Sequence, residues 1–195
     1  MKDISLHILD IAQNSTAAAA TRIRTVIRAD RKSGMLEILI EDNGCGMDEE
    51  LLARVTDPFS TTRTTRKVGL GIPLFKASAE QAGGSFRITS QKGVGTVVRS
   101  SYQMDNIDRP PLGDVAGVIT DLSAAYPAID FELSLECGDW KFTFSSREVR
   151  QSLGEVPISE FRVARWLREY IEEGILEIFG GVLSEIVSGT RSNPE

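Results

Sequence analysis

A globular fold that mixes helices and strands, α/β or α+β, is what this sequence of 195 residues predicts. The first observation is its composition, because 41% hydrophobic and 26% charged residues are ordinary for a globular protein. The second is a pair of segments, 21–30 and 35–42, that alternate apolar and polar residues around the turn RKSG and so predict a hairpin. The third is the helical spacing of apolar residues on either side of this hairpin.

The remaining elements of the first hundred residues follow from the same signals. Apolar spacing and alanine content predict a helix over residues 2–19. A short helix is expected at 48–55, and a second at 71–82, where two glycines end it. The segments SFRITSQ and GTVVRSSYQM predict two more strands.

Residues 105–113 predict a linker, because DNIDRPPLGD combines a proline pair with polar residues. We therefore expect one unit over 1–104 and a small α+β unit over 114–195. The second unit begins with a helix at 114–125, continues with a hairpin of IDFELSLE and WKFTFSS, and includes an amphipathic helix at 159–173. It shows no catalytic cluster, and partner binding is one role open to it.

Charge and cysteine content exclude several classes of function. A net charge of −6 argues against a nucleic-acid partner, which would require an excess of Lys and Arg. No apolar run approaches the length of about 20 residues needed to span a bilayer, and the acidic start MKDISLHILD does not resemble a signal peptide. A cytoplasmic location is therefore expected. Cys45 and Cys137 lack metal-binding spacing and are expected to be idle thiols.

The first predicted helix carries a polar stripe that interrupts its apolar face. Asp10 and Asn14 are spaced by one helical turn within HILDIAQNSTAAAATRI. About thirty residues later, Asp42, Gly44 and Gly46 form D-x-G-x-G at the end of a predicted strand. Taken alone, that motif is also a plain turn signal.

A second glycine motif lies farther along the chain. Gly69 and Gly71 open a helix, where backbone N–H groups and the helix dipole favour phosphate. The basic and hydroxyl-rich run at 61–67 suits a polyanion, although a solvated loop is the alternative interpretation.

Together and in this order, these motifs resemble those of the Bergerat-fold ATPases, the superfamily of gyrase, heat-shock-90 chaperones, histidine kinases and mismatch-repair ATPases. The resemblance covers roughly residues 1–104 and includes all four signature motifs. It implies a histidine-kinase-like ATP-binding domain with an α+β fold, a two-layer α/β sandwich in which helices cover a mixed sheet. The small α+β C-terminal unit would follow this domain.

The resemblance also implies roles for individual residues. Asn14 matches the helix Asn that coordinates Mg²⁺ bridging the phosphates of ATP, and an amide oxygen is a suitable ligand for this ion. Asp42 matches the Asp that accepts a hydrogen bond from the adenine amino group. Gly44 and Gly46 would let the chain pass close to the purine, and Met47 would pack near its face.

Further matches concern the loop over the phosphates and a later strand. The family's Phe motif and phosphate-covering loop, together with a strand Thr of its adenine network, are matched here by Phe59, Thr61, Thr62, Gly69, Leu70, Gly71 and Thr96.

Two residues depart from the family pattern, and a third lies on the same predicted helix as Asn14. Asp10 stands where the mismatch-repair and gyrase helix has a Glu as general base, and its side chain is shorter by about 1.5 Å of reach. Lys67 replaces a Gly of the histidine-kinase pattern and adds a cation near the expected γ-phosphate. His7, the only histidine, is expected to be a packing or surface residue, with phospho-acceptor as the minor alternative.

The function expected from this resemblance is a regulatory ATPase or protein kinase that binds Mg²⁺ and ATP and acts on or through an unidentified protein partner. The alternative is a non-catalytic nucleotide-binding interaction module, which the Asp at position 10 and the Lys at position 67 keep open. The oligomeric state is not indicated by the sequence.

Overall fold

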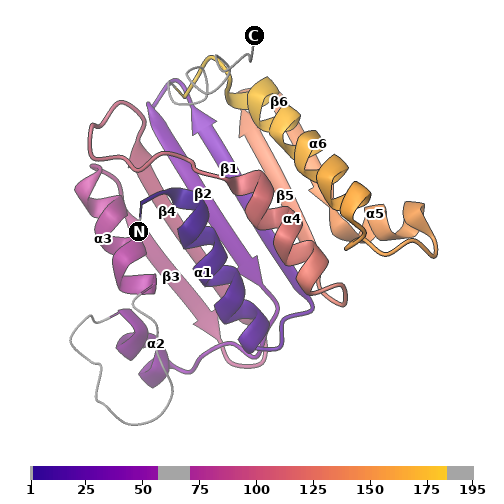
Figure 1. The fold of residues 1–195 in the computed structure, drawn as a ribbon. Coiled ribbons are helices and arrows are strands. Elements are labelled where there is room, and N and C mark those ends of the chain that lie inside the picture. The colour runs from indigo at the N-terminus through magenta and orange to yellow at the C-terminus, as the bar shows by residue number, and fades with distance from the viewer. Residues whose placement is uncertain (1, 57–70, 184–195) are drawn as a thin grey trace.

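A single mixed sheet organises the molecule. The computed structural model describes residues 2–56 and 71–183. Its six strands lie in the order β3-β4-β2-β1-β5-β6 (Figure 1). In chain order they are β1 (Arg22–Asp30), β2 (Met35–Asp42), β3 (Phe86–Gln91), β4 (Gly95–Gln103), β5 (Asp130–Cys137) and β6 (Trp140–Ser145).

Helices cover one face of this sheet and leave the other face open (Figure 1). The helices of the described residues are α1 (Ile4–Ala17), α2 (Glu49–Thr56), α3 (Gly71–Gln81), α4 (Val115–Ala125), α5 (Ser146–Leu153) and α6 (Phe161–Phe179). Of these, α2 lies beyond the lower edge of the sheet and packs against α3 (Figure 1). The resulting two-layer α+β architecture is the fold class that the sequence predicted. Within the described ranges, no helix combines the length and apolar character that crossing a bilayer requires.

Strand alternation explains why one face is covered and the other is not. In β1, Ile23, Thr25 and Ile27 are buried beneath the helices, whereas Arg24 and Arg28 point to the opposite, open face. On that face Arg28 forms ion pairs with Glu136 of β5 at 2.7 Å and with Glu37 of β2 at 3.7 Å. Most apolar side chains of β1 thus face the helices and its arginines face solvent, although Val26, on the same side as Arg24 and Arg28, is also buried.

The C-terminal segment does not form a sheet of its own. β5 pairs in parallel with β1, with Ile23 opposite Phe131, and β6 then pairs antiparallel with β5. Helix α4 packs against both α1 and α6. Residues 105–113, predicted as a linker between two units, therefore connect two parts of one sheet and one hydrophobic core.

Two helices differ from their sequence-based expectations. α5 was not expected, because Val149 and Leu153 are the only large apolar residues in its eight positions. α6 continues beyond the expected end at 173, past Gly174. A Cβ at that position would lie 2.6 Å from the ring of Phe142, so this glycine permits close packing of α6 on β6 instead of ending the helix.

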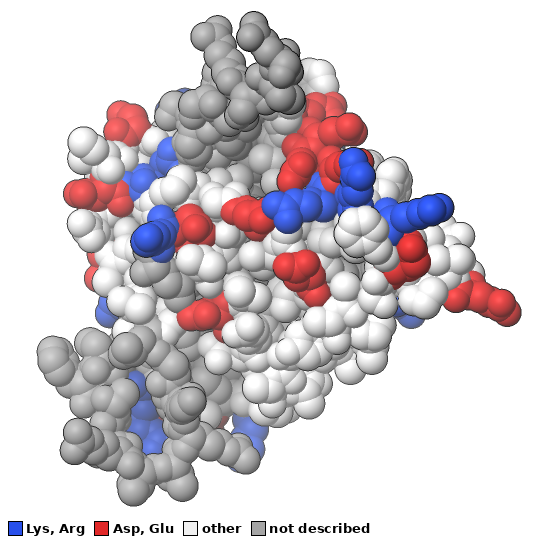
Figure 2. Space-filling view, in the orientation of Figure 1, with Lys and Arg blue, Asp and Glu red and all other residues white. Residues whose placement is uncertain are grey.

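On the helix-covered face, acidic and basic side chains lie next to one another over the side of the molecule that carries α6 (Figure 2). There Arg168 contacts Asp114 at 2.7 Å and Glu172 at 2.9 Å. These groups are about half exposed, so each pair contributes little stability.

Candidate functional site

The carboxylate of Asp42, at the end of β2, accepts hydrogen bonds from two different segments. The buried Ser15 of α1 donates its hydroxyl to Oδ2 of Asp42 at 2.6 Å, and the backbone N–H of Gly44 donates to Oδ1 at 2.9 Å. Each carboxylate oxygen keeps further acceptor capacity, because an ionised carboxylate offers about four lone-pair sites. Asp42 is therefore a fixed acceptor that can still receive a hydrogen bond from a ligand.

Ser15, like Ser90 described below, is a site residue that sequence reasoning missed. It belongs to the polar stripe of α1 and follows Asn14 directly, but no role was assigned to it. A polar residue on the buried side of an amphipathic helix was the available signal, since a buried hydroxyl requires a partner.

The turn after β2 is clamped between two other segments. The N–H of Cys45 donates to the carbonyl of Ala18 at 2.8 Å, and the N–H of Gly93 donates to the carbonyl of Cys45 at 2.7 Å. Gly46 has φ +63, and a Cβ on it would lie 2.0 Å from the carbonyl oxygen of Gln91. This glycine is therefore required by the contact between the turn and the β3–β4 hairpin.

A hydroxyl pair extends the polar cluster across the sheet. Ser90 accepts from the N–H of Met47 at 2.8 Å and lies 2.9 Å from the hydroxyl of Thr96. Thr96 is directly opposite Asp42 in the β2–β4 register. The structure thus brings Asp42, Thr96 and the backbone of Met47, three of the residues predicted to surround the purine, to one end of the sheet.

Asp10 and Asn14 lie one turn apart on α1, and their positions differ in exposure. Asn14 is exposed, whereas Asp10 is half-buried against the first residue of α3. A Cβ on Gly71 would lie 2.6 Å from Oδ2 of Asp10. Burial raises the pKa of this carboxyl, and the positive charge of the N-terminus opposes that shift. Asp10 therefore sits where the N-terminus of α3 meets α1.

These features share one end of the molecule. The C-terminal end of α1, the end of β2, the β3–β4 turn and the N-terminus of α3 lie together at the lower edge of the sheet in Figure 1. Among residues 2–56 and 71–183, no group of three His, Cys, Asp or Glu side chains is arranged to hold a metal ion.

His7 is a core residue of the α1–α3 interface. Its side chain is 1% exposed, stacks on Phe75 with ring centroids 4.5 Å apart, and has Nε2 3.2 Å from the hydroxyl of Ser78. Burial lowers the pKa of His7 to about 4, with a smaller lowering from the N-terminus and an opposing effect of Asp3. The packing role expected from the sequence is therefore the one found, and a buried ring is closed to phosphorylation.

Several predicted site residues cannot be placed. Phe59, Thr61, Thr62, Lys67, Gly69 and Leu70 lie outside the described residues. Their expected roles stay predictions.

The sequence matches the family model described as "Histidine kinase-, DNA gyrase B-, and HSP90-like ATPase" over residues 2–106. Similar curated proteins include the signal transduction histidine-protein kinase AtoS of Escherichia coli, 35% identical over 49% of this chain and 15% of AtoS. Another is the sensor histidine kinase CitA of Klebsiella pneumoniae, 31% identical over 47% of this chain and 17% of CitA. The matched segments thus span about a sixth of the length of these kinases.

A solved structure also resembles the chain. It is the Aquifex aeolicus MutL ATPase domain complexed with ADP, with a TM-score of 0.47 and 16% identity over 78% of this chain and 69% of that one.

Proposed function

Because the chain belongs to the histidine kinase-, DNA gyrase B- and HSP90-like ATPase family, we propose that it binds Mg²⁺-ATP at the end of the sheet where α1, β2 and α3 meet. The observation that carries this proposal is the carboxylate of Asp42, fixed by Ser15 and by the N–H of Gly44. Adenine presents an amino group that donates to such an acceptor, and Thr96 lies opposite Asp42 to complete a polar network. Asp42 would thereby select adenine.

The phosphates would lie between α1 and the start of α3. The exposed amide of Asn14 can supply one oxygen ligand to Mg²⁺, which would neutralise phosphate charge when bound. The first N–H groups of α3 have no intrahelical acceptors, and together with the helix dipole they favour an anion. The predicted contributions of Thr61, Thr62, Lys67, Gly69 and Leu70 belong to the same proposal.

We propose that the reaction is phosphoryl transfer, either to water or to a residue of a protein partner. Phosphoryl transfer depends mostly on positioning and electrostatic stabilisation. Asp10 is the candidate base, since its raised pKa makes the ionised carboxylate a better proton acceptor. The similarity to AtoS and CitA, both named as histidine kinases, supports a protein acceptor.

One observation favours a second candidate function, a nucleotide-binding module without catalysis. The carboxyl of Asp10 lies against Gly71 and is shorter than the Glu of the related gyrase helix. If that contact keeps the carboxyl away from the γ-phosphate, ATP would bind without turnover and would only stabilise a docking surface.

Incubation with γ-labelled ATP distinguishes these functions. The full chain is assayed alone and with host lysate, and label is followed on this chain, on other proteins and in free phosphate. Asn14→Ala should abolish turnover, and Gln13→Ala should not, because the exposed Gln13 side chain points about 100° around the helix from that of Asn14. Loss of turnover in Asp10→Asn with retained ATP binding would support its role as base.

The outcomes separate as follows. Free phosphate alone indicates an ATPase, and label on another protein indicates a kinase. Binding without label transfer indicates the module. Failure of the wild-type chain to bind Mg²⁺-ATP would contradict both functions.

A further inference from the structure

The two edge strands of the sheet differ in what they expose. An edge strand has a row of backbone N–H and C=O groups without ladder partners, which another chain can pair with. At β3 the exposed side chains are Arg87, Thr89 and Gln91. At β6 the first residue is Trp140, whose large apolar side chain is 69% exposed. An exposed tryptophan beside unpaired backbone groups favours β6, of the two edges, as the one that binds another chain.

An apolar groove lies at the other end of β6, on the helix-covered face. It has a volume of about 300 Å³, and its apolar lining is Phe144, Val149, Leu153, Trp166 and Tyr170. Trp166 stacks on Tyr170 with ring centroids 5.4 Å apart, and Trp166 remains 55% exposed. Aromatic side chains held in this way lose little freedom when a partner covers them.

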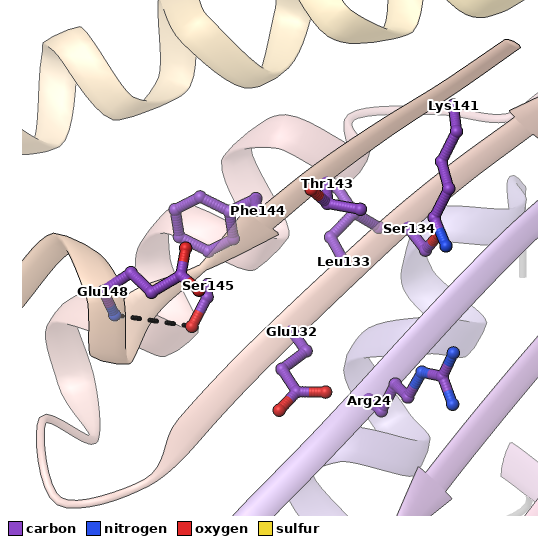
Figure 3. A pocket seen from close by; sticks show the side chains of 9 residues that line it. All are labelled: Arg24, Glu132, Leu133, Ser134, Lys141, Thr143, Phe144, Ser145 and Glu148. Carbon is purple, nitrogen blue, oxygen red and sulfur yellow. Dashed lines mark hydrogen bonds between the residues drawn. The ribbon is translucent and has the colours of Figure 1, made fainter.

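A second pocket lies on the open face at the same end of β6. It has a volume of about 260 Å³, and Figure 3 shows Glu132 and Glu148 beside the C-terminal end of β6, with Lys141 toward the other end. Both pockets are lined by Thr143, Phe144, Ser145 and Glu148. They therefore flank the same short piece of β6, one on each face of the sheet.

We propose that two copies of this chain associate by antiparallel pairing of their β6 strands, centred on Phe142. In this register Trp140 of one copy lies opposite Phe144 of the other, and Lys141 lies opposite Thr143. Trp140 shares the helix-covered face with Phe144, because alternate residues of a strand share a face. The tryptophan is thus directed to the apolar groove of the second copy.

Charge complementarity supports the same occupant. Lys141 projects from the open face, where it forms a 3.5 Å ion pair with Glu136 and is about half exposed. In the paired dimer it approaches the pocket of the other copy, where Arg24 lies opposite Glu132 and leaves Glu148 as the carboxylate available to Lys141. A two-fold interface needs both members of each complementary pair on one surface. Trp140 and Lys141 lie at the start of β6, and the groove, Glu148 of α5 and Glu132 of β5 lie beside its other end.

The oligomeric state of the full chain tests this proposal. Light scattering after size exclusion is measured at protein concentrations from about 1 μM to about 100 μM. It should show a monomer–dimer equilibrium with a dissociation constant inside this range. Trp140→Ala should weaken dimerisation about 30-fold, the effect expected for truncating an interface tryptophan. Tyr126→Ala, an exposed aromatic residue outside β6, is the matched control and should dimerise normally.

An exchange of charges tests the register and does not depend on Trp140. Lys141→Glu and Glu148→Lys should each weaken self-association, by about tenfold. Mixing the two variants should restore dimers, because Glu at position 141 then meets Lys at position 148 across the interface. Circular dichroism confirms that each variant is folded.

Two results would overturn the proposal. A wild-type chain that stays monomeric throughout would leave the β6 edge to a strand of a different protein. A dimer unaffected by Trp140→Ala, or variants that do not complement each other, would place the interface elsewhere. Neither result depends on nucleotide binding.

Discussion

Polar groups are arranged differently in the two halves of the sheet. The first half is the part around β2 and β4 with α1, and the second half is the part around β5 and β6. Around β2 and β4, polar side chains from different elements converge at one end, as in the contacts of Ser15 with Asp42 and of Ser90 with Thr96. Around β5 and β6, charged groups such as Glu136 spread over an open face in exposed ion pairs. Exposed large aromatic side chains of the described residues all lie between 126 and 170.

This difference matches the two proposed roles, nucleotide binding in one half of the sheet and self-association in the other. A ligand site needs acceptors whose positions are fixed by neighbouring groups, because loosely held groups must be ordered when the ligand binds. An association surface needs exposed apolar area instead. The first half meets the first requirement and the second half meets the second, although both share one core.

Paired glycine substitutions should give the largest contrast between the halves. Gly46 and Gly138 both have positive φ, but a Cβ on Gly46 meets the carbonyl of Gln91 at 2.0 Å whereas a Cβ on Gly138 meets no atom within 4 Å. Gly46→Ala should lower the free energy of unfolding by about 3–4 kcal/mol, and Gly138→Ala by about 1 kcal/mol. Urea unfolding measures both, and equal losses would contradict the special packing of the turn after β2.

Acidification should lower the free energy of unfolding of the protein through His7, which lies in the first half. The pKa of His7 is lowered from 6.5 to about 4, so between these values the unfolded chain binds a proton that the folded chain does not. Its contribution to stability is complete above pH 6.5 and falls as the pH drops toward 4, by about 3 kcal/mol.

The measurement is urea unfolding of the wild type and of His7→Gln from pH 7 to pH 4. Asp10, whose pKa is raised by burial, acts in the opposite direction but is present in both proteins. The wild type should therefore lose more stability than the variant. Parallel pH profiles would show that His7 is not the titrating group.

A substitution at the α1–α3 contact should have a smaller effect. Gly71→Ala places a Cβ 2.6 Å from Oδ2 of Asp10 and should cost about 1–2 kcal/mol in unfolding free energy. Asp10→Ala removes the carboxyl, so the double variant should be more stable than the sum of the single effects predicts. Simple additivity in a double-mutant cycle would refute direct contact.

Matched serine substitutions should have the smallest effect and should separate the halves by ligand binding. Ser15 donates to Asp42 at 2.6 Å, and Ser134 donates to Glu136 at 2.9 Å. Ser15→Ala should weaken Mg²⁺-ATP binding about tenfold, because Asp42 loses one of its fixing hydrogen bonds. Ser134→Ala should leave the affinity unchanged. Similar affinities for the two variants in titration calorimetry would disprove this role of Ser15.

The sequence allowed prediction of the elements that depend on local signals. β2 begins at Met35 and ends at Asp42 as expected, because a turn precedes it and its side chains alternate. The pairing of β5 with β1 could not be predicted, since a contact between residues about 108 positions apart leaves no local pattern. The short helix α5 was missed because two apolar residues give too weak a period.

The candidate site shows the same limit. Asp42 and Thr96 were predicted as neighbours of the purine and lie opposite each other in the β2–β4 register. Ser15 was missed because its partner Asp42 is 27 residues away. The contact between Asp10 and Gly71 was also not foreseen, since it depends on how α1 and α3 pack. The motifs thus predicted residues that lie together at one end of the sheet, but tertiary packing determines which groups fix their positions.

Recognition of adenine by Asp42 is tested by titration calorimetry of the full chain with Mg²⁺-ATP and Mg²⁺-GTP. GTP carries a carbonyl where ATP carries the amino group. The wild type should bind ATP and discriminate against GTP, and Asp42→Asn should weaken ATP binding roughly 100-fold while keeping the fold. Equal affinity of the wild type for both nucleotides, or unchanged ATP affinity in Asp42→Asn, would show that Asp42 does not select adenine.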